Sequence, residues 1–406
     1  MEYYTHQLAN NLRLIYYPSK SDVGYCGMFI NTGSRDELPN EQGLAHFIEH
    51  TIFKGTNKRS LFQILSRIDD VGGEINAYTT KEETGIYSTF LKRDLERAME
   101  LIGDIVFNSQ FPEKELLKEV EVVVDEINSY KDSPAELIFD DFEDLVFKNH
   151  TMGRNILGIP KVIRKFNKKS IEQFVGRTYN TDQMVFCVLG NFSQQRVVNL
   201  FERYFSSIAN NSRAWSRDII SPYTPQNLQI NKRTFQSHCL IGNRAYNSQD
   251  DRRLPLHLLN NLLGGSASNS RLNWALREQS GIAYTVESNY TPYSDTGVFN
   301  IYFGTDKANL DTSLEIVHKE LAKLRNEKLN EKELKRIKRQ TIGQSTIGFE
   351  NKESLLFSVA KSYMLYGKVD TMEEVYRRIE AVTAEQLQDI ANDIFDESKL
   401  SYLTFK

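Results

Sequence analysis

Cysteine is scarce in this chain of 406 residues, which contains only Cys26, Cys187 and Cys239. The three lie far apart, each among apolar or aromatic neighbours that are typical of strands. This spacing argues against a cysteine-based zinc site, because the ligands of such sites recur a few residues apart. We therefore expect three buried free thiols.

Long apolar runs are also missing. No stretch of 18 or more apolar residues occurs, which excludes a membrane-spanning helix. The first residues, MEYYTHQLANNLRLIYYPSK, contain neither a basic segment followed by an apolar core nor the arginine-rich composition of a transit peptide. We expect a cytoplasmic protein without a membrane partner.

Neither sign of charge dominates, since 50 Lys and Arg stand against 54 Asp and Glu, for a net charge of -4. Acids and bases are mixed along the chain, so nothing points to a nucleic-acid partner. The most basic run, KLRNEKLNEKELKRIKRQ, is interrupted by acids and indicates a solvated helix. The G-K-[ST] of a phosphate loop does not follow Gly264 and Gly265, so we expect no nucleotide cofactor.

What the sequence does contain is an internal repeat, offset by about 210 residues. LAHFIEHTIFKG, from Leu44, aligns with LPLHLLNNLLGG, from Leu254. ETGIYSTFL, from Glu83, resembles DTGVFNIYF, from Asp295, and both alternate as strands do. The chain therefore looks duplicated.

The duplication predicts an α+β fold of two homologous α/β-sandwich domains, each with an antiparallel-rich sheet and helices. We expect these domains at residues 1–207 and 226–406. The polar, proline-containing stretch at 208–225 is the predicted linker.

The first copy contains an inverted H-x-x-E-H motif, formed by His46, Glu49 and His50. Residues four apart lie on the same face of a helix, so the two imidazoles can reach one ion, with Glu49 beside them. Imidazole and carboxylate ligands suit zinc, and a catalytic zinc site needs three protein ligands and an open position. We therefore expect a third ligand, a carboxylate or a third histidine, from elsewhere in the first domain.

The second copy lacks this motif. It has Leu256, Leu259 and Asn260 at the matching positions. Metal chemistry is thus expected in the first copy only.

The best source of the third ligand is FPEKELLKEVEVVVDEINSY, which predicts a helix starting near Pro112 with an apolar stripe. By helical angle, Asp125 points away from that stripe and Glu121 flanks one edge. Glu119 and Glu126, two turns apart, flank the other edge. Periodicity alone does not choose between the edges.

These segments together resemble the inverzincin peptidases, the family of pitrilysin, insulin-degrading enzyme and mitochondrial processing peptidase. The resemblance covers nearly the whole chain, through GSRDELPNEQGLAHFIEHTIFKGT, INAYTTKEETGIYSTFL, the acid-rich helix, GRNILG and MVFCVLGNF. It implies that one zinc ion per chain is bound by His46, His50 and Glu126, with Glu49 as general base. It also implies that Glu119 holds a ligand histidine in orientation; a plain solvated acid is the alternative for this residue.

The resemblance further implies residues that bind substrate. GGEINAYTTKEETGIYSTFL predicts a β-hairpin whose first strand is an edge, and Asn76 and Ala77 match positions that pair with substrate backbone. An ordinary protected edge is the alternative. Phe53 matches an aromatic beside the scissile bond, although an isolated helical aromatic is often part of a core.

In the second domain, LLGGSASNSRLNWALREQSGIAYTVES resembles a glycine-rich loop followed by a substrate-binding pair, Arg277 and Tyr284. For Arg277, a surface salt bridge is the alternative. Larger relatives close four such domains as two bowls around a peptide, and this two-domain chain corresponds to half of that clamshell. We therefore predict a homodimer in which each subunit completes the other's site, with a heterodimer of related subunits as the alternative.

These observations predict a zinc metalloendopeptidase that hydrolyses peptides or unfolded polypeptides inside a closed chamber. The rival hypothesis is a non-catalytic peptide-binding or structural subunit of the same fold.

Overall fold

The computed structural model describes residues 3–232 and 234–406, which form two compact units. Neither unit is one continuous segment. The first consists of Met1–Asn128, Arg154–Asp218 and Gly348–Thr371, and the second consists of Ser129–Gly153, Ile219–Ile347 and Met372–Lys406.

The first unit is built on a six-stranded sheet with the order β1-β2-β6-β3-β5-β4. Its strands are β1 (Tyr4–Gln7), β2 (Arg13–Pro18), β3 (Val23–Ile30), β4 (Glu74–Thr79), β5 (Thr84–Leu91) and β6 (Met184–Gly190). Only β2 and β6 run parallel, and the other neighbours are antiparallel. Every residue of β6 is buried, because both faces of this sheet are covered. The hairpin strand β4 lies at one edge.

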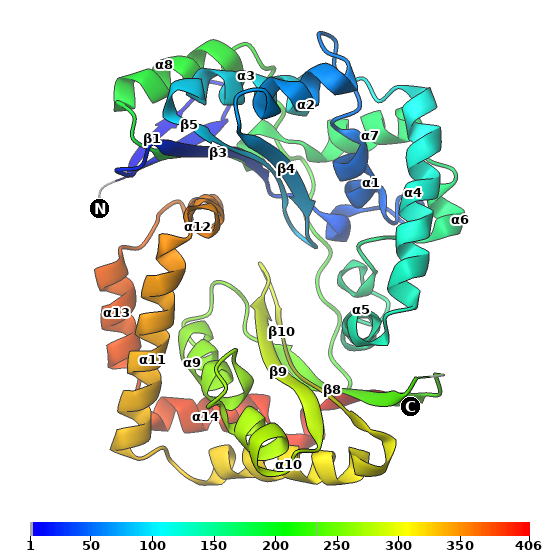
Figure 1. Ribbon diagram of the computed structural model, residues 1–406, viewed down its shortest axis with the longest axis vertical. Helices are drawn as coiled ribbons and strands as arrows, with labels where there is room; N and C mark the ends of the chain where they lie inside the picture. The colour runs from blue at the N-terminus through cyan, green and yellow to red at the C-terminus, as the bar shows by residue number, and fades with distance from the viewer. Residues whose placement is uncertain (1–2, 233) are drawn as a thin grey trace. The chain divides into compact units, whose positions relative to one another are not determined.

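One face of this sheet packs on helices of the first half of the chain. They are α1 (Leu44–Thr51), α2 (Leu61–Asp69), α3 (Leu95–Asn108), α4 (Glu113–Lys131), α6 (Pro160–Ile163), α7 (Lys168–Thr178) and α8 (Gln194–Phe205). The other face packs on α12 (Lys352–Tyr366), which comes from the second half. Figure 1 shows α12 in orange against the blue and green strands. Leu356 and Ala360 of α12 are completely buried there.

The second unit has a five-stranded sheet with the order β7-β11-β8-β10-β9. Its strands are β7 (Asn227–Ile230), β8 (Gln236–Ala245), β9 (Ala283–Pro292), β10 (Gly297–Asp306) and β11 (Ser401–Phe405). The helices are α9 (Arg253–Gly264), a π-helix (Asn273–Gln279), α10 (Leu310–Asn326), α11 (Glu331–Glu350), α13 (Met372–Ala381) and α14 (Ala384–Ile394). The opposite face of the sheet packs on α5 (Pro134–Val146), which comes from the first half.

The predicted duplicated α+β fold is confirmed, since β2-β6-β3-β5-β4 and β7-β11-β8-β10-β9 follow the same path. The boundaries at residues 207 and 226 separate the two sheets, and residues 209–226 contain no helix or strand. They do not separate the compact units, however. Each half gives one helix, α5 or α12, to the sheet of the other half. This exchange buries the second face of each sheet. No local sequence pattern predicts that α5 and α12 pack on the sheet of the other half.

The few cysteines and the lack of long apolar runs predicted buried free thiols and no membrane-spanning helix. All three cysteines are buried and free. In the part of the chain that the structure describes, no helix is both long enough and apolar enough to cross a bilayer.

Candidate metal centre

Helix α1 presents the H-x-x-E-H motif on the side turned away from its apolar face. Leu44, Phe47 and Ile48 are completely buried in the core of the first unit. His46 and His50 lie one turn apart on the other side, with ring centroids 4.6 Å apart. The short helix is therefore held by its apolar face, and this fixes the direction of both imidazoles.

The start of α1 is capped by the carboxylate of Glu37, which lies in the loop that leads into the helix and was not predicted from the sequence. The helix begins after Gly43 without a side-chain cap of the usual kind. Instead, the two carboxylate oxygens of Glu37 accept hydrogen bonds from the backbone N–H groups of Gly43, at 2.9 Å, and Ala45, at 2.8 Å. Glu37 is buried, and its own carbonyl accepts a hydrogen bond from Arg154 Nη1 at 2.8 Å. N–H groups that would lack a partner are thus satisfied at the turn before His46.

Helix α4 turns one edge of its apolar stripe toward α1, and this settles the choice that periodicity left open. Glu119 is buried and Glu126 is half-buried, whereas Glu121 and Asp125 are exposed. The acids on the Glu119 edge therefore face the histidines.

The three predicted ligands lie together. One ligand atom from each of His46, His50 and Glu126 falls within 4.8 Å of the other two. Oε2 of Glu126 is 3.4 Å from Nε2 of His50 and 3.8 Å from Nε2 of His46. Both imidazoles thus direct their Nε2 atoms toward the same carboxylate oxygen.

The donor set fits a zinc ion. Oε2 of Glu126 is buried and receives no hydrogen bond from any described residue, a costly state for a carboxylate oxygen without another partner. Burial, and then the nearby His50, lower the pKa of His46 to about 4. A neutral imidazole is the form that binds a metal. Two imidazole nitrogens and one carboxylate are a known ligand set of catalytic zinc.

Glu119 occupies the other side of the His50 ring. Its Oε1 is 3.0 Å from Nδ1 of His50, and its Oε2 is 2.7 Å from Nζ of Lys54. Glu119 was predicted from the sequence, whereas Lys54, three residues after the end of α1, was not. No spacing rule connects this lysine to an acid on a distant helix.

Glu49 lies half-buried beside the triad, on the same helix. Burial raises the pKa of its carboxyl group, while a hydrogen bond with Thr79 and the nearby His50 act in the opposite direction. Thr79 is the last residue of β4, so the edge strand ends next to the motif helix.

The two residues predicted to pair with substrate backbone lie on β4. Asn76 is opposite Tyr87 and Ala77 is opposite Ile86 in the pairing with β5. Among the described strands, β4 has this one neighbour only, so its other edge is unpaired. Phe53 is partly buried and packs against the core of the first unit.

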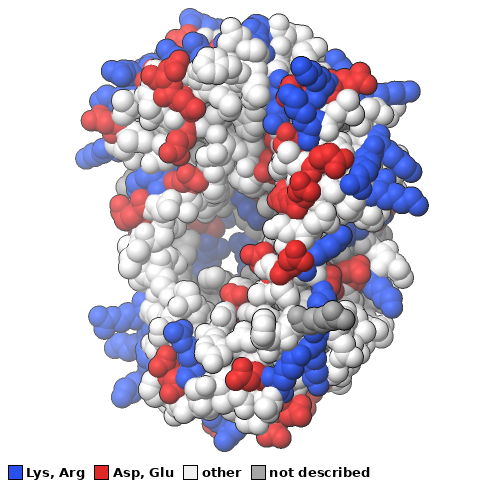
Figure 2. All heavy atoms as spheres, turned by 45° about the vertical axis from the view of Figure 1, so that its right-hand side comes forward, with Lys and Arg blue, Asp and Glu red and all other residues white. Residues whose placement is uncertain are grey.

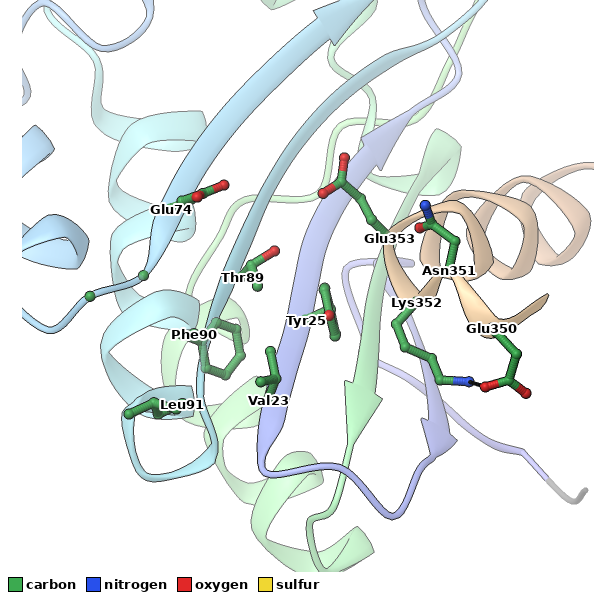
Figure 3. Close-up of a pocket in the computed structure, with 12 residues that line it drawn as sticks. Val23, Tyr25, Glu74, Thr89, Phe90, Leu91, Glu350, Asn351, Lys352 and Glu353 are labelled. Atoms are coloured by element: carbon green, nitrogen blue, oxygen red, sulfur yellow. Dashed lines mark ion pairs between the residues drawn. The ribbon is translucent and has the colours of Figure 1, made fainter. Parts of the chain in front are cut away.

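A pocket of about 480 Å³ lies at the first residue of β4. Figure 3 shows Glu74 of β4 on one side of it and Glu353 of α12 on the other, with Tyr25 of β3 between them. Lys352 pairs with Glu350 at 3.8 Å on the α12 side. The pocket and the motif helix therefore adjoin opposite ends of the same edge strand.

Among its described residues, the second unit has no counterpart of the triad. Leu256 and Leu259 of α9 are buried in its core, and Asn260 is buried beside them. Arg277 and Tyr284 belong to this unit, in the π-helix and at the start of β9. Nε of Arg277 lies 3.9 Å from Oε1 of Glu278, and Tyr284 is 67% exposed. Both predicted substrate-binding side chains are thus at the surface of the second unit.

Acidic and basic side chains alternate on the face of the molecule drawn in Figure 2. This agrees with the balanced composition of the chain.

Comparison with known proteins gives two family matches. The model described as "Insulinase (Peptidase family M16)" matches residues 14–159, and the model described as "Peptidase M16 inactive domain" matches residues 165–341. The first match contains the triad. The second contains Leu256, Leu259 and Asn260, the positions of the second repeat that replace the motif.

Similar sequences cover more than nine-tenths of the chain. It is 34% identical over 371 residues to "Uncharacterized zinc protease YmxG" of Bacillus subtilis (strain 168), covering 91% of this chain and 90% of that relative. It is 33% identical over 402 residues to an "Uncharacterized zinc protease" of Rickettsia bellii (strain RML369-C), covering 97% and 95%.

Two solved structures show the same fold. A protease from Helicobacter pylori superposes with a TM-score of 0.90 at 20% identity, covering 100% of this chain and 99% of that chain. A peptidase M16 inactive domain from Pseudomonas fluorescens superposes with a TM-score of 0.92 at 17% identity, covering 100% and 98%.

Proposed function

The chain belongs to the insulinase (peptidase M16) family, and on that premise we propose that it is a zinc-dependent endopeptidase acting on peptides or unfolded polypeptides. The observation that carries this proposal is the convergence of His46, His50 and Glu126 within 4.8 Å, with Glu49 on the same helix. Relatives that share about a third of the sequence are named zinc proteases.

His46, His50 and Glu126 would hold one zinc ion per chain. When bound, zinc supplies Lewis acidity toward a water molecule and toward the carbonyl of the scissile peptide. Glu119 accepts the Nδ1–H of His50 and so keeps Nε2 of that ring free to act as a ligand.

Glu49 is the proposed general base. One of its carboxylate oxygens takes the proton of the attacking water and returns it to the leaving nitrogen. Burial raises the pKa of this carboxyl group, which suits a group that must accept a proton and then release it near neutral pH.

The unpaired edge of β4 is the proposed site for the substrate main chain. An extended peptide that adds to this edge forms backbone hydrogen bonds beside Asn76 and Ala77, next to the motif helix. Only an unfolded or short segment can pair in this way, and this is why we propose such substrates. Phe53 remains a proposed contact beside the scissile bond.

Arg277 and Tyr284 are the proposed substrate clamps, contributed in a homodimer by the partner copy. A guanidinium and a phenol can hold substrate carbonyls and stabilise the oxyanion that develops. In this arrangement, the paired copies enclose the chamber in which cleavage occurs.

A metal-dependent cleavage assay tests the function. The purified protein is incubated with an internally quenched peptide library, with and without a chelator, and the metal content is measured in parallel. We expect cleavage that the chelator abolishes and that zinc restores, with cobalt and manganese tested beside it. Zinc binding without cleavage of any peptide would favour the rival, a non-catalytic peptide-binding or structural subunit.

A further inference from the structure

Lys54 was not among the predicted site residues, but it contacts one of them, Glu119. Its Nζ lies 2.7 Å from Oε2 of Glu119, and the two side chains are only 20% and 10% exposed. The backbone N–H of Lys54 donates to the carbonyl of Thr51, the last residue of α1, at 3.0 Å. The ammonium group is therefore held close to the end of the helix that carries the histidines.

The two oxygens of Glu119 have different partners. Oε1 faces Nδ1 of His50 at 3.0 Å, while Oε2 faces the ammonium group of Lys54. A carboxylate engaged at both oxygens has one favoured orientation, because rotation of the group weakens both contacts. That orientation directs Oε1 at the ring nitrogen on the side away from Glu126.

The lysine next to Glu119 in the sequence has a different partner. Lys118, the adjacent residue on α4, is exposed and pairs with Glu115 at 2.8 Å. An ion pair at the surface contributes little to stability, but the Lys54–Glu119 pair is mostly shielded from solvent. Its loss would leave a largely buried carboxylate oxygen without this partner.

The two repeats provide an internal comparison. In the alignment of LAHFIEHTIFKG with LPLHLLNNLLGG, Gly264 takes the place of Lys54. The repeat that lacks the histidines and the glutamate thus also lacks the lysine. This is what is expected if the lysine serves the ligand set rather than the packing of the fold.

We propose that Lys54 is a positioning residue for the metal ligand His50, and that it acts through Glu119. Lys54 holds the carboxylate, the carboxylate accepts Nδ1–H, and Nε2 of the ring is thereby aimed at the site shared with His46 and Glu126. The inference rests on the proposed function for the identity of the metal, and it concerns a part of the site that the peptide does not need to touch.

Zinc affinity of the purified protein, measured by competition with a chromogenic chelator, tests the proposal without any substrate. The variants are Lys54→Met, Lys54→Arg, Glu119→Gln and the double variant of Lys54→Met with Glu119→Gln. Lys118→Met is the matched control, because it removes a lysine from α4 that does not contact Glu119 in the structure. The melting temperature of each metal-free variant is recorded beside the affinity.

We expect Glu119→Gln to weaken zinc binding by about 10- to 100-fold, as for other groups that orient a ligand. Lys54→Met should weaken zinc binding less, by roughly three- to tenfold, because Lys54 acts on His50 only through the carboxylate of Glu119. Lys54→Arg should retain most of the affinity, and Lys118→Met should match the unmodified protein. In the double variant, Lys54→Met should add almost nothing to the effect of Glu119→Gln.

Unchanged zinc affinity in Lys54→Met would overturn the inference, and so would a loss that adds in full to that of Glu119→Gln. A loss of metal-free stability in Lys54→Met large enough to explain the weaker binding would overturn it as well. The proposed function fails separately, if the unmodified protein binds zinc but cleaves no peptide. Normal cleavage together with unchanged affinity in Lys54→Met would sink this inference alone.

Discussion

Gly43 and Gly158 touch back to back at the start of the helix that carries the proposed zinc ligands. A Cβ atom built on Gly158 would lie 2.4 Å from the Cα atom of Gly43, and one on Gly43 would lie 2.8 Å from the Cα atom of Gly158. Both glycines have positive φ angles, of +93° and +81°. The loop that contains Gly158 therefore sets the position at which α1 begins, and both positions require glycine.

Gly158→Ala should destabilise the fold by about 3 kcal/mol, because it combines a left-handed backbone with a clash against backbone atoms. It should also weaken zinc binding, since α1 has to move. The matched control is Gly176→Ala, in the helix α7, where an added Cβ meets no atom within 4 Å. That change should be neutral or stabilise by about 0.5–1 kcal/mol. Urea unfolding measures the stability of both variants, and equal midpoints for Gly158→Ala and Gly176→Ala would contradict the prediction.

Glu49→Gln should remove turnover while zinc remains bound. The amide cannot take a proton from water, so we expect kcat to fall by about 10²- to 10⁴-fold or more. Zinc content is measured on the same sample. Asp125→Asn, an exposed acid on α4, is the control and should cleave normally. Near-normal peptide cleavage by Glu49→Gln would remove Glu49 from its assigned role.

Mixing two inactive variants tests whether sites are completed between subunits. On this proposal, Glu49→Gln inactivates the metal site of the subunit that carries it. The double change Arg277→Ala with Tyr284→Phe instead removes the substrate-binding pair that a subunit contributes to the site of its partner. In a freely exchanging homodimer, an equal mixture forms one intact site in half of the dimers, so about a quarter of the normal activity should return. Absence of any recovery, in a mixture shown by labelling to have exchanged subunits, would contradict a shared site.

The second unit should lose stability in acid partly through His238. Its Nδ1 lies 2.8 Å from the hydroxyl group of Tyr302, and burial lowers its pKa. The unfolded chain, with a histidine pKa of about 6.5, binds this proton first as the pH falls. The stability that neutral His238 contributes is therefore complete above that pH and is lost as the pH falls through the folded-state pKa.

Urea midpoints between pH 7.5 and pH 5 measure this effect. The decline should be shallower in His238→Gln than in the unmodified protein, and an identical slope would exclude His238 as a cause. His6→Gln serves as the control for removal of a histidine, because that ring pairs with Glu202 on the surface at 3.1 Å.

The parts of the site that lie on one helix or one strand were accessible from the sequence. Helical spacing alone places His46, Glu49 and His50 on one side of α1, and alternation identifies β4 and β5. The repeat predicts two sheets with the same strand path, and the structure has them. The helical spacing and the strand alternation depend on residues close together in the sequence, and the repeat is visible as a similarity between two segments.

Contacts between distant segments were not accessible in this way. The spacing along α4 left open whether the edge with Glu121 or the edge with Glu119 and Glu126 faces the histidines. The packing of α4 against α1 places the second edge beside them. Lys54, just after α1, contacts Glu119 of α4. The cap supplied by Glu37 comes from the loop that leads into α1, and it depends on how that loop folds back on the helix. Such pairings depend on tertiary packing, which periodicity does not encode.

The exchange of α5 and α12 has a consequence for how such a chain arises. Both helices follow the long helix of their repeat, α4 or α11, at the same place in the order of elements. In a single repeat, one face of the sheet would stay exposed to solvent until a helix of a second copy packed on it. Folding of such a repeat would therefore depend on protein concentration. When two repeats are joined in a single polypeptide, the helix of one repeat packs on the sheet of the other within the same chain. Association of separate chains is then no longer needed to complete either sheet.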